Sequence, residues 1–589
     1  MPAGPIFARE ILTAPRRPRH YLMRSSFVAA LLILFYTVRQ ATIGFQDVQF
    51  AGDVASFSSL VFQVFSTLQL TLGMFFATLF TASSVAQEKD RQTLILLLMT
   101  DMKNHELALG KLGASLLVAA VLLAASLPVS CSLRLLGGVT WPQVFWASAV
   151  IGSASLAAGA WGGMVAFRKE KTFQTLAISV LGVVVFIAAA ESLVTLAGSD
   201  SRVAFWIAAL SPYRSLSEVL FPLQKTIAGP IQVSALPSVL AFLSLAVLLT
   251  AITVVRMRVW NPSQTMRVSA LQMAVPEEQN ETASAAPARA AVHHRTVWTN
   301  PVIWREMKTR PYGKRVFWIK LVYVLLALGV VWSAGSTPFS GDTLVLGMVS
   351  PAAFAFLGVG IMSLLLINAQ AVTSITTERD GRTLEPLLIT DLSAREFMMG
   401  KIGGAIWNAG EMIFLPLILL VGLTMARVVP SLTPENCFYL IMAFLVLALF
   451  AISLGLHAGL SYENSRTAIG NSLGTMFFLF IGIFVFMLLL VEARSSFAMQ
   501  IQSFIIFIGF GSLGLFSSLT HKNPSSALTM ASMSLPFLTF YAITDFLLGG
   551  NLGVCFWICV AYGFTSVAML IPAMTDFDVA LGRNTQDQG

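Results

Sequence analysis

The feature that most constrains this chain is a series of long apolar blocks, each the size of a membrane-spanning helix. A helix needs about 20 apolar residues to cross the hydrocarbon core of a bilayer. In the first part of the chain such blocks lie at 26–46, 60–86, 109–135, 143–167, 173–197 and 236–257. In the second part they lie at 318–336, 346–376, 403–426, 436–461, 466–491 and 553–574. The pattern predicts an all-α polytopic membrane protein with about 12 transmembrane helices.

Composition excludes a soluble protein of this length. Only 11% of the 589 residues are charged and 56% are hydrophobic, whereas a soluble domain carries about 25% charged residues. The four cysteines lie in or beside apolar blocks, with no histidine or carboxylate at metal-ligand spacing, so we interpret them as packing residues. No metal site is expected.

The basic residues predict which side of the membrane each loop occupies. All but eight of the 37 lysines and arginines fall in short segments on one side of the predicted spans or in the tail. Cytoplasmic loops carry this excess of positive charge. We therefore expect a multi-pass protein of the plasma (bacterial inner) membrane with both termini in the cytoplasm, and no nucleic-acid partner. The eight exceptions are Arg39, Arg134, Arg202, Arg214, Lys225, Arg427, Arg494 and Lys522.

Two further segments need an interpretation. Residues 497–519 are apolar but carry three glycines, and a single extra span there would place the termini on opposite sides. We interpret them as a re-entrant or surface-lying element within a long outer loop, 492–552. Residues 261–297 are polar, rich in Ala, Pro, Ser and Glu, and lack apolar periodicity. They are expected to form a flexible cytoplasmic linker.

Two segments of the chain recur in its second half. Residues 88–113, EKDRQTLILLLMTDMKNHELALGKLG, match 378–403, ERDGRTLEPLLITDLSAREFMMGKIG, at twelve of 26 positions. Residues 5–24 also align without gaps to 301–320, with Arg9 and Glu10 opposite Arg305 and Glu306. In each half the one segment precedes the first span and the other follows the second span, with similar charges around them. The repeat is therefore parallel, about an axis along the membrane normal.

The repeat divides the chain into two six-span halves, 1–260 and 298–589, joined by the linker. The two halves facing each other would enclose a central pathway. In each half an amphipathic segment precedes the first span, at 5–24 and 301–320, and a conserved-length loop follows the second span, at 88–111 and 378–401.

The repeated loop combines charges, an apolar stripe and a helix cap. Its leucines lie at positions i, i+3 and i+4, which is one face of a short helix. Thr100 and Asp101, and their counterparts Thr390 and Asp391, can cap a following helix. A helix that merely lies at the membrane interface is the alternative. The candidate docking residues are Glu88, Asp90, Thr93, Leu94, Leu97, Leu98, Thr100, Asp101, Glu378, Asp380, Thr383, Leu384, Leu387, Leu388, Thr390 and Asp391.

The pattern E-[KR]-D-x-x-T-L-x-x-L-L-x-T-D…G-K, placed after the second of six spans, resembles that of the ABC-2 type (type-2) ABC transporter permeases. The resemblance implies that each repeated loop holds a coupling helix received by an ATP-binding subunit. It also implies that the segments before the first spans are elbow helices, with Arg9, Glu10, Arg305 and Glu306. Both permease halves would be fused in one chain.

The resemblance implies ATP-driven transport, but the chain has no G-x-x-x-x-G-K-[ST] phosphate-binding loop. We therefore expect no enzyme activity and no cofactor bound by this chain. ATP and Mg²⁺ would bind a separate ABC ATP-binding subunit, in two copies per fused permease. Export is the expected direction, and the substrate is not indicated.

Charged residues within the spans are candidates for lining the pathway. A charge at mid-bilayer costs about 2.5–3.5 kcal/mol on insertion scales, so such residues face protein or water. Glu191 and Glu411 are the deepest. The alternative is that they pair across span interfaces. An ion-coupled secondary transporter with two parallel six-span repeats is the alternative function, although such carriers concentrate their specific residues at the midplane.

Overall fold

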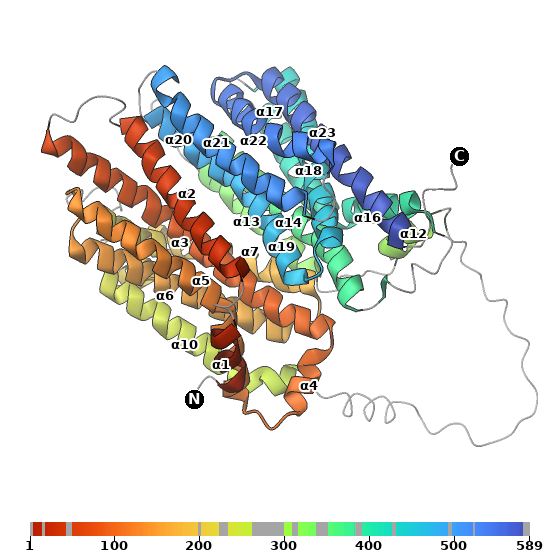
Figure 1. Cartoon of the computed structure of the whole chain (residues 1–589), viewed down its shortest axis with the longest axis horizontal. Coiled ribbons are helices and arrows are strands. Elements are labelled where there is room, and N and C mark those ends of the chain that lie inside the picture. Colours follow the sequence, from red (N-terminus) through yellow and green to blue (C-terminus); the bar gives the residue numbers. More distant parts are fainter. Residues whose placement is uncertain are drawn as a thin grey trace, which may run out of the picture.

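The computed structural model contains helices throughout and no strand in the part of the chain that it describes. It describes residues 4–13, 18–42, 50–197, 202–222, 234–261, 298, 300–308, 316–336, 351–381, 383–384, 392–426, 432–492, 497–521 and 525–580. The predicted linker, 261–297, lies outside this part except for Asn261. Figure 1 shows the helices as one slab of roughly parallel rods.

The first half supplies two short N-terminal and loop helices, six long helices and two short outer ones. They are α1 (Gly4–Thr13), α2 (Pro18–Thr42), α3 (Ala51–Asp90), α4 (Thr93–Met99), α5 (Asn104–Leu135), α6 (Trp141–Arg168), α7 (Thr172–Ala197), α8 (Arg202–Ala209), α9 (Pro212–Leu220) and α10 (Ala235–Trp260).

The second half repeats this order and adds a helical hairpin before its last helix. Its helices are α12 (Pro301–Lys308), α13 (Val316–Ser336), α14 (Pro351–Asp380), α16 (Ala394–Asn408), α17 (Gly410–Met425), α18 (Pro434–Ser461), α19 (Ser465–Phe477), α20 (Ile483–Glu492), α21 (Phe497–Leu519), α22 (Ser526–Leu547) and α23 (Asn551–Ala580). One π-helical turn, Phe478–Gly482, joins α19 to α20.

Within the described residues, eleven helices are long and apolar enough to cross a membrane. The pair α16 and α17, bent by 55°, makes a twelfth if it is one broken span. The first long helix of each half, α2 with 25 residues and α13 with 21, lies outside that count. The expected all-α polytopic membrane protein is thus confirmed, although the twelve helices are not the twelve that the sequence predicted.

The interpretation of 497–519 as a re-entrant or surface element is wrong. This segment is one continuous 23-residue helix, α21, and α22 runs back beside it. Near the start of α21, Gln502 accepts a hydrogen bond from Tyr36 of α2 at 2.7 Å. At its other end, the carbonyl of Ser518 accepts one from Tyr462, just beyond the end of α18, at 3.0 Å. The hairpin therefore runs the full length of the bundle and back.

This hairpin also explains how the chain can contain an extra apolar helix at 497–519 and still have both ends on one side. A single extra span would have separated the termini, but two extra helices leave both described ends of the chain at one end of the bundle. The last residues of α21 lie at that same end, beside Tyr462. Lys522, counted above as an outer residue, lies outside the described residues.

The described helices cover parts of the predicted elbow segments. The segment 5–24 contains most of α1 and the beginning of α2. The segment 301–320 contains α12 and the beginning of α13. Residues 14–17 and 309–315, between these helices, lie outside the described residues.

Equivalent helices pack in the same way in the two halves. The hydroxyl of Thr78 in α3 donates to the carbonyl of Ala158 in α6 at 3.2 Å, and the amide of Asn368 in α14 donates to that of Ala451 in α18 at 2.9 Å. Gly162 of α6 lies so close to α3 that an added Cβ would be 2.6 Å from the Thr78 carbonyl oxygen. Small residues allow this close approach of helices in membranes.

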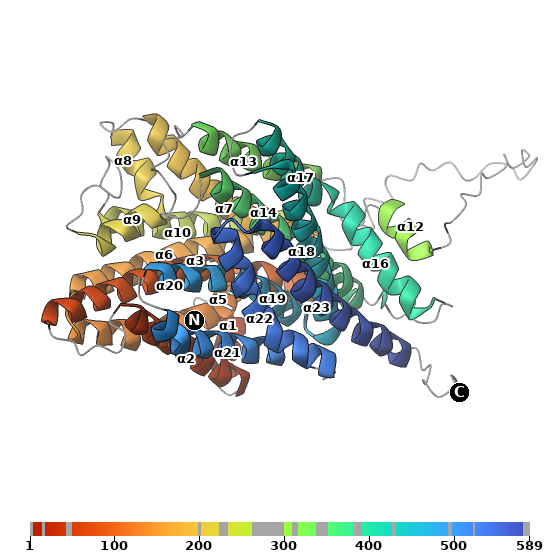
Figure 2. The same ribbon diagram turned by 90° about the horizontal axis from the view of Figure 1, so that it is seen from above.

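The halves meet through α3 and α19, through α7 and α14, and along α2 and α21. Figure 2 shows α2 and α21 side by side in the second view as well. At the α3 and α19 contact, the ring of Phe477 lies 5.5 Å from that of Phe75 and 6.4 Å from that of Phe76. Phenylalanine rings therefore make up much of this contact between α3 and α19.

Candidate functional site

The repeated charged residues gather at one end of the bundle, which we call the motif end. It holds α1, α4, α12 and the beginnings of α5 and α16, and both described ends of the chain lie there (Figure 1). We call the opposite end the far end.

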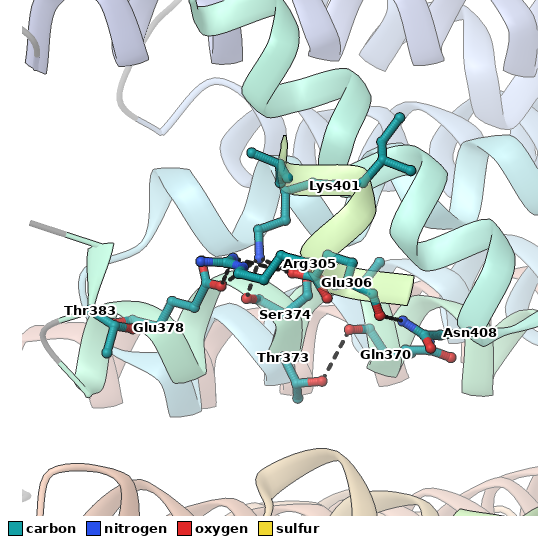
Figure 3. A network of polar contacts seen from close by, with 12 residues as sticks. Arg305, Glu306, Gln370, Thr373, Ser374, Glu378, Thr383, Lys401 and Asn408 are labelled. Atoms are coloured by element: carbon teal, nitrogen blue, oxygen red, sulfur yellow. Dashed lines mark hydrogen bonds and ion pairs between the residues drawn. The ribbon is translucent and has the colours of Figure 1, made fainter. Parts of the chain in front are cut away.

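In the second half, four charged side chains form a buried cluster (Figure 3). The ammonium of Lys401 lies 2.7 Å from a carboxylate oxygen of Glu306 and 2.9 Å from one of Glu378. The guanidinium of Arg305 pairs with Glu378, and with Glu306 at 3.4 Å. Lys401 is 1% exposed, so water screens these ion pairs little. Two cations balance two anions, and the cluster joins α12, α14 and α16.

Glycines let the elbow helix α12 sit directly on α16. A Cβ added at Gly400 would lie 2.5 Å from the side chain of Val302, and one at Gly404 would lie 2.6 Å from that of Glu306. Any larger residue at these positions would push α12 away. The glycine of the G-K motif therefore serves this close approach, which brings Glu306 within reach of Lys401.

The first half makes only part of these contacts. Lys111 pairs with Glu88, as Lys401 does with Glu378. The ring of Phe7 in α1 packs on Gly113 of α5, where a Cβ would lie 2.9 Å from it. Arg9 of α1 is exposed and Glu10 is half-buried, and Glu10 acts electrostatically on Arg466 of the other half.

The middle residue of the E-[KR]-D motif, Lys89 or Arg379, binds the end of the fourth long helix in each half. The ammonium of Lys89 donates to the carbonyls of Phe167 and Lys169, at 2.5 and 2.9 Å. The guanidinium of Arg379 donates to the carbonyls of Gly459, at 2.8 Å, and Tyr462. These carbonyls at the ends of α6 and α18 lack intrahelical partners, and a cation is favourable there.

The motif aspartates hold the beginning of the fifth long helix in each half. The Asp90 carboxylate accepts a hydrogen bond from the hydroxyl of Thr172, and the Asp380 carboxylate accepts one from that of Ser465. Asp380 also accepts from Arg91 of the first half, at 3.2 Å. The two copies of the motif are thus in direct contact across the interface between the halves.

Arg466 is a second link between the halves at this end. Its guanidinium lies 5.3 Å from the ring centroid of Phe80 and donates to the carbonyl of Ser115 at 3.3 Å. The two rings of Phe80 and Phe76 stack beside it, 5.5 Å apart.

The apolar stripe of the first loop faces its own chain. Leu94 is fully buried, and Leu97 and Leu98 are half-buried against Leu107 of α5 and Phe167 of α6. The exposed apolar side chains of α4 are Leu96 and Met99, 64% and 71% exposed. Leu97, predicted to contact a partner, therefore packs within the chain, and the free face lies on the opposite side of α4.

The polar residues of the loop are placed differently from the prediction. The Thr93 hydroxyl donates to the carbonyl of Glu88, and Thr383 does the same to Glu378. Thr100 and Asp101 are exposed, and the following helix begins later, with the Glu106 carboxylate accepting from the amide of Lys103 at 3.0 Å. The predicted cap at Thr100 and Asp101 is therefore wrong, because α5 starts only at Asn104.

The second copy of the loop is described only in part. Ser393 and Glu396 cap α16, in the place of Lys103 and Glu106. Leu384 is half-buried and packs against the core of the second half. The remaining predicted residues lie outside the described residues: Leu387, Leu388, Thr390 and Asp391.

The two pathway candidates are in ion pairs at separate places. Glu191 of α7 accepts from Arg214 of α9, at 2.7 Å, and from Ser211, at 2.6 Å. Glu411, at the beginning of α17, pairs with Lys320 of α13. Pairing across helix interfaces, the alternative stated above, is therefore what both residues do, and each pairing lies within one half.

Sequence reasoning noted the glycine and lysine of the G-K motif but did not select them as site residues. It also missed Glu106 and Glu396, although these are identical in the repeat and occupy equivalent caps. Among the described residues, no three His, Cys, Asp or Glu side chains gather as a metal ion would require. No protein-family model matches the chain, and no curated protein matches it either.

Proposed function

We propose that this chain is the transmembrane permease of an ATP-driven ABC transporter, with both halves of the permease fused in one polypeptide. A separate ATP-binding subunit, in two copies, docks on the motif end. That end faces the cytoplasm of the plasma (bacterial inner) membrane, because the repeated loops and most basic residues lie there. The work of this chain is transport, outward in direction.

The observation that carries the proposal is an exposed apolar face on α4, next to charged residues that bind the long helices of the same half. On α4, Leu96 and Met99 are exposed beyond the ends of the long apolar helices, where no described part of the chain covers them. Apolar side chains presented together on a surface mark interaction sites. A protein partner at this place buries them.

The charged residues before α4 explain how a displacement of α4 would be transmitted to the long helices. In the same short stretch, Glu88 binds α5, Lys89 binds the end of α6, and Asp90 binds the beginning of α7. Four long helices of the half are thereby tied to the residues directly before α4. Displacement of α4 by a partner would move them as one body, which is how rigid-body transitions transmit small local shifts.

ATP and Mg²⁺ belong to the partner subunit in this proposal. The chain has no Walker-type phosphate loop. Gly400 of the second repeated G-K pair packs against Val302 of α12 instead. The residues of this chain bind and transmit, and the hydrolysis takes place on the docked subunit.

The test is co-purification of an ATPase with the affinity-tagged full chain. An aspartate at an apolar interface leaves a charge buried without a partner, which costs several kcal/mol. Leu96→Asp with Met99→Asp should therefore release the ATPase while the chain still inserts, since both side chains are exposed in the permease alone. Leu135→Asp is the matched control, because Leu135 is 84% exposed at the far end.

Two results decide against the proposal. If no ATPase accompanies the wild-type chain, ATP coupling is excluded. If the double variant retains the ATPase at the yield of Leu135→Asp, docking on α4 is excluded. An ion-coupled secondary transporter is then favoured, and ion-gradient-driven uptake by reconstituted protein, without ATP, distinguishes it.

A further inference from the structure

Each half of the protein contains one large apolar cavity. The cavity in the second half has a volume of about 260 Å³ and that in the first half about 380 Å³. Both exceed the 150 Å³ apolar cavity that stays dry in a protein core and binds benzene. Neither cavity belongs to the motif end described above.

The two cavities lie between equivalent helices. The one in the second half is enclosed by α14, α18, α20, α22 and α23. The one in the first half is enclosed by α3, α6, α7 and α10, with Pro212 of α9 at its edge. Helices α3, α6, α7 and α10 correspond in order to α14, α18, α19–α20 and α23. Equivalent helices therefore border an apolar cavity in each half.

The cavity in the second half lies toward the far end of the bundle, and the cavity in the first half reaches from that side to mid-depth. In the second half the lining runs from Leu440 to Leu447 in α18, which begins at Pro434. In the first half it includes Phe242 to Leu249 in α10, which begins at Ala235, and Ala154 to Trp161 in the middle of α6. One turn of helix rises about 5.4 Å, so both cavities lie at a depth that acyl chains of the far-end leaflet reach.

The lining offers nothing to a polar ligand or to water. Tyr562, a lining residue, has its hydroxyl hydrogen-bonded to that of Thr539 at 2.8 Å. Trp161, which lines the other cavity, donates its indole N–H to the carbonyl of Ser179 at 3.1 Å. A buried water needs two to four polar partners. With those groups already paired, the favoured occupant is hydrocarbon.

We propose that each cavity binds an acyl chain of a membrane lipid, entering from the leaflet at the far end. Each lining includes an exposed residue through which a chain can pass: Gly358 in the second half and Ala189 in the first. The surrounding solvent at this depth is the bilayer itself, so acyl chains are present at the entrance at high concentration. This inference does not depend on ATP-driven transport.

Leucine substitutions that fill the cavity entrances test the proposal. A Cβ added at Gly358 meets no atom within 4 Å, so Gly358→Leu can project into free space. Leucine is also the better helix former, by about 1 kcal/mol. Ala189→Leu fills the other entrance. Gly422→Leu is the matched control, because Gly422 is exposed on α17, also with no atom within 4 Å of an added Cβ, and lines neither cavity.

The experiment is photo-crosslinking of the full chain in nanodiscs of phosphatidylethanolamine and phosphatidylglycerol that carry a diazirine in mid-acyl chain. Peptide mass spectrometry then maps the labelled residues. We expect label on Ile361 and Leu447 in the second half and on Phe186 and Leu245 in the first, above the label on lipid-facing helix surfaces. Gly358→Leu should remove only the second-half label, Ala189→Leu only the first-half label, and Gly422→Leu neither.

The proposal is overturned if cavity residues carry no more label than exposed surface residues such as Leu325 and Ile418. It is also overturned if filling an entrance leaves the label inside that cavity unchanged. If Gly358→Leu does not insert, Ile361→Phe occupies the same cavity from its wall and must reduce the label on Leu447 in the same way.

Discussion

Replacement of Lys401 by methionine tests whether the buried cluster holds the elbow helix in place. Methionine keeps much of the length of lysine and removes its charge. The side chain is 1% exposed, and its ammonium contacts both Glu306, at 2.7 Å, and Glu378, at 2.9 Å. Lys401→Met therefore leaves two carboxylates in a place that water does not reach, with Arg305 as their remaining cation.

The magnitude follows from the burial. Removal of one partner of a buried ion pair costs about 3–5 kcal/mol. Arg305 still pairs with both carboxylates, so we expect the lower end of that range, about 3 kcal/mol. A difference of 1.36 kcal/mol is tenfold in an equilibrium constant, so α12 should open about a hundred times more often. Lys111 and Glu88 are 12% and 23% exposed, and Lys111→Met should cost only about 1–2 kcal/mol.

Hydrogen exchange of the elbow helices measures these opening free energies directly. Backbone amides of 301–308 should lose about two orders of magnitude of protection in Lys401→Met, while those of 4–13 should be unchanged. Adding Glu306→Gln to Lys401→Met restores charge balance, leaves the Arg305 and Glu378 pair, and should recover part of the protection. Unchanged protection of 301–308 in the single variant would refute the reasoning, as would an equal loss with Lys111→Met in 4–13.

Three further predictions concern the halves and the hairpin. Arg91→Ala should cost less than about 1 kcal/mol, because Arg91 is 43% exposed, whereas Asp380→Ala also loses Ser465 and should lower the thermal unfolding temperature further; the reverse order would contradict the assignment. In a cysteine-free background, His521→Cys should react with impermeant maleimide only from the side of the motif end and Leu548→Cys only from the far side, whereas an outer loop at 492–552 would label both from one side. Gly511→Leu should lower the unfolding temperature, since its Cβ would lie 2.2 Å from the ring of Phe478 and overpacking costs about 1–3 kcal/mol; Gly514→Leu, with open space around it, is the control and should change it little.

The apolar blocks predicted most long helices to within a few residues. The block 143–167 is α6, Trp141–Arg168, and the block 173–197 is α7, Thr172–Ala197. A run of apolar residues long enough to cross the bilayer has few other folds open to it in lipid, because every backbone group must be satisfied within the helix. The blocks could not indicate that α3 continues to Asp90, since its last turn lies among the charges of the motif.

The hairpin was missed because α22 does not read as an apolar block. Its sequence contains serines, threonines and Asp545. The polar side chains that interrupt it face protein: Ser532 and Thr539 are buried, and Thr539 bonds Tyr562 of α23. A membrane helix surrounded by other helices can carry such residues at little cost. Hydropathy along the sequence cannot tell a polar residue that faces protein from one that faces lipid.

The candidate site was predictable in its residues but not in its contacts. Identity in the two copies selected Glu88, Asp90 and their counterparts as docking residues, and the structure places their carboxylates in ion pairs and hydrogen bonds within the chain. It could not indicate that they bind helices of their own chain, because a charge pattern does not specify its partner. The stripe of Leu94 and Leu97 had the same ambiguity, since an amphipathic face can pack on its own bundle or on another protein. The structure resolves it, because Leu94 is 2% exposed and Leu96 is 64% exposed.

The distribution of strong and weak contacts indicates where the protein can move. Within each half, the charged motif makes largely buried contacts, and the ammonium of Lys401 alone joins two carboxylates from two helices. Between the halves at the same end, the ion pair of Arg91 and Asp380 is partly open to water. The guanidinium of Arg466 and buried apolar side chains such as Leu79 and Phe173 also contact the other half. An exposed ion pair contributes about 0–1 kcal/mol to stability. Removing one partner of a buried ion pair costs more, because the remaining charge stays buried without compensation. We therefore expect a force applied at the motif end to shift the halves against each other before it breaks the buried charge cluster within one half.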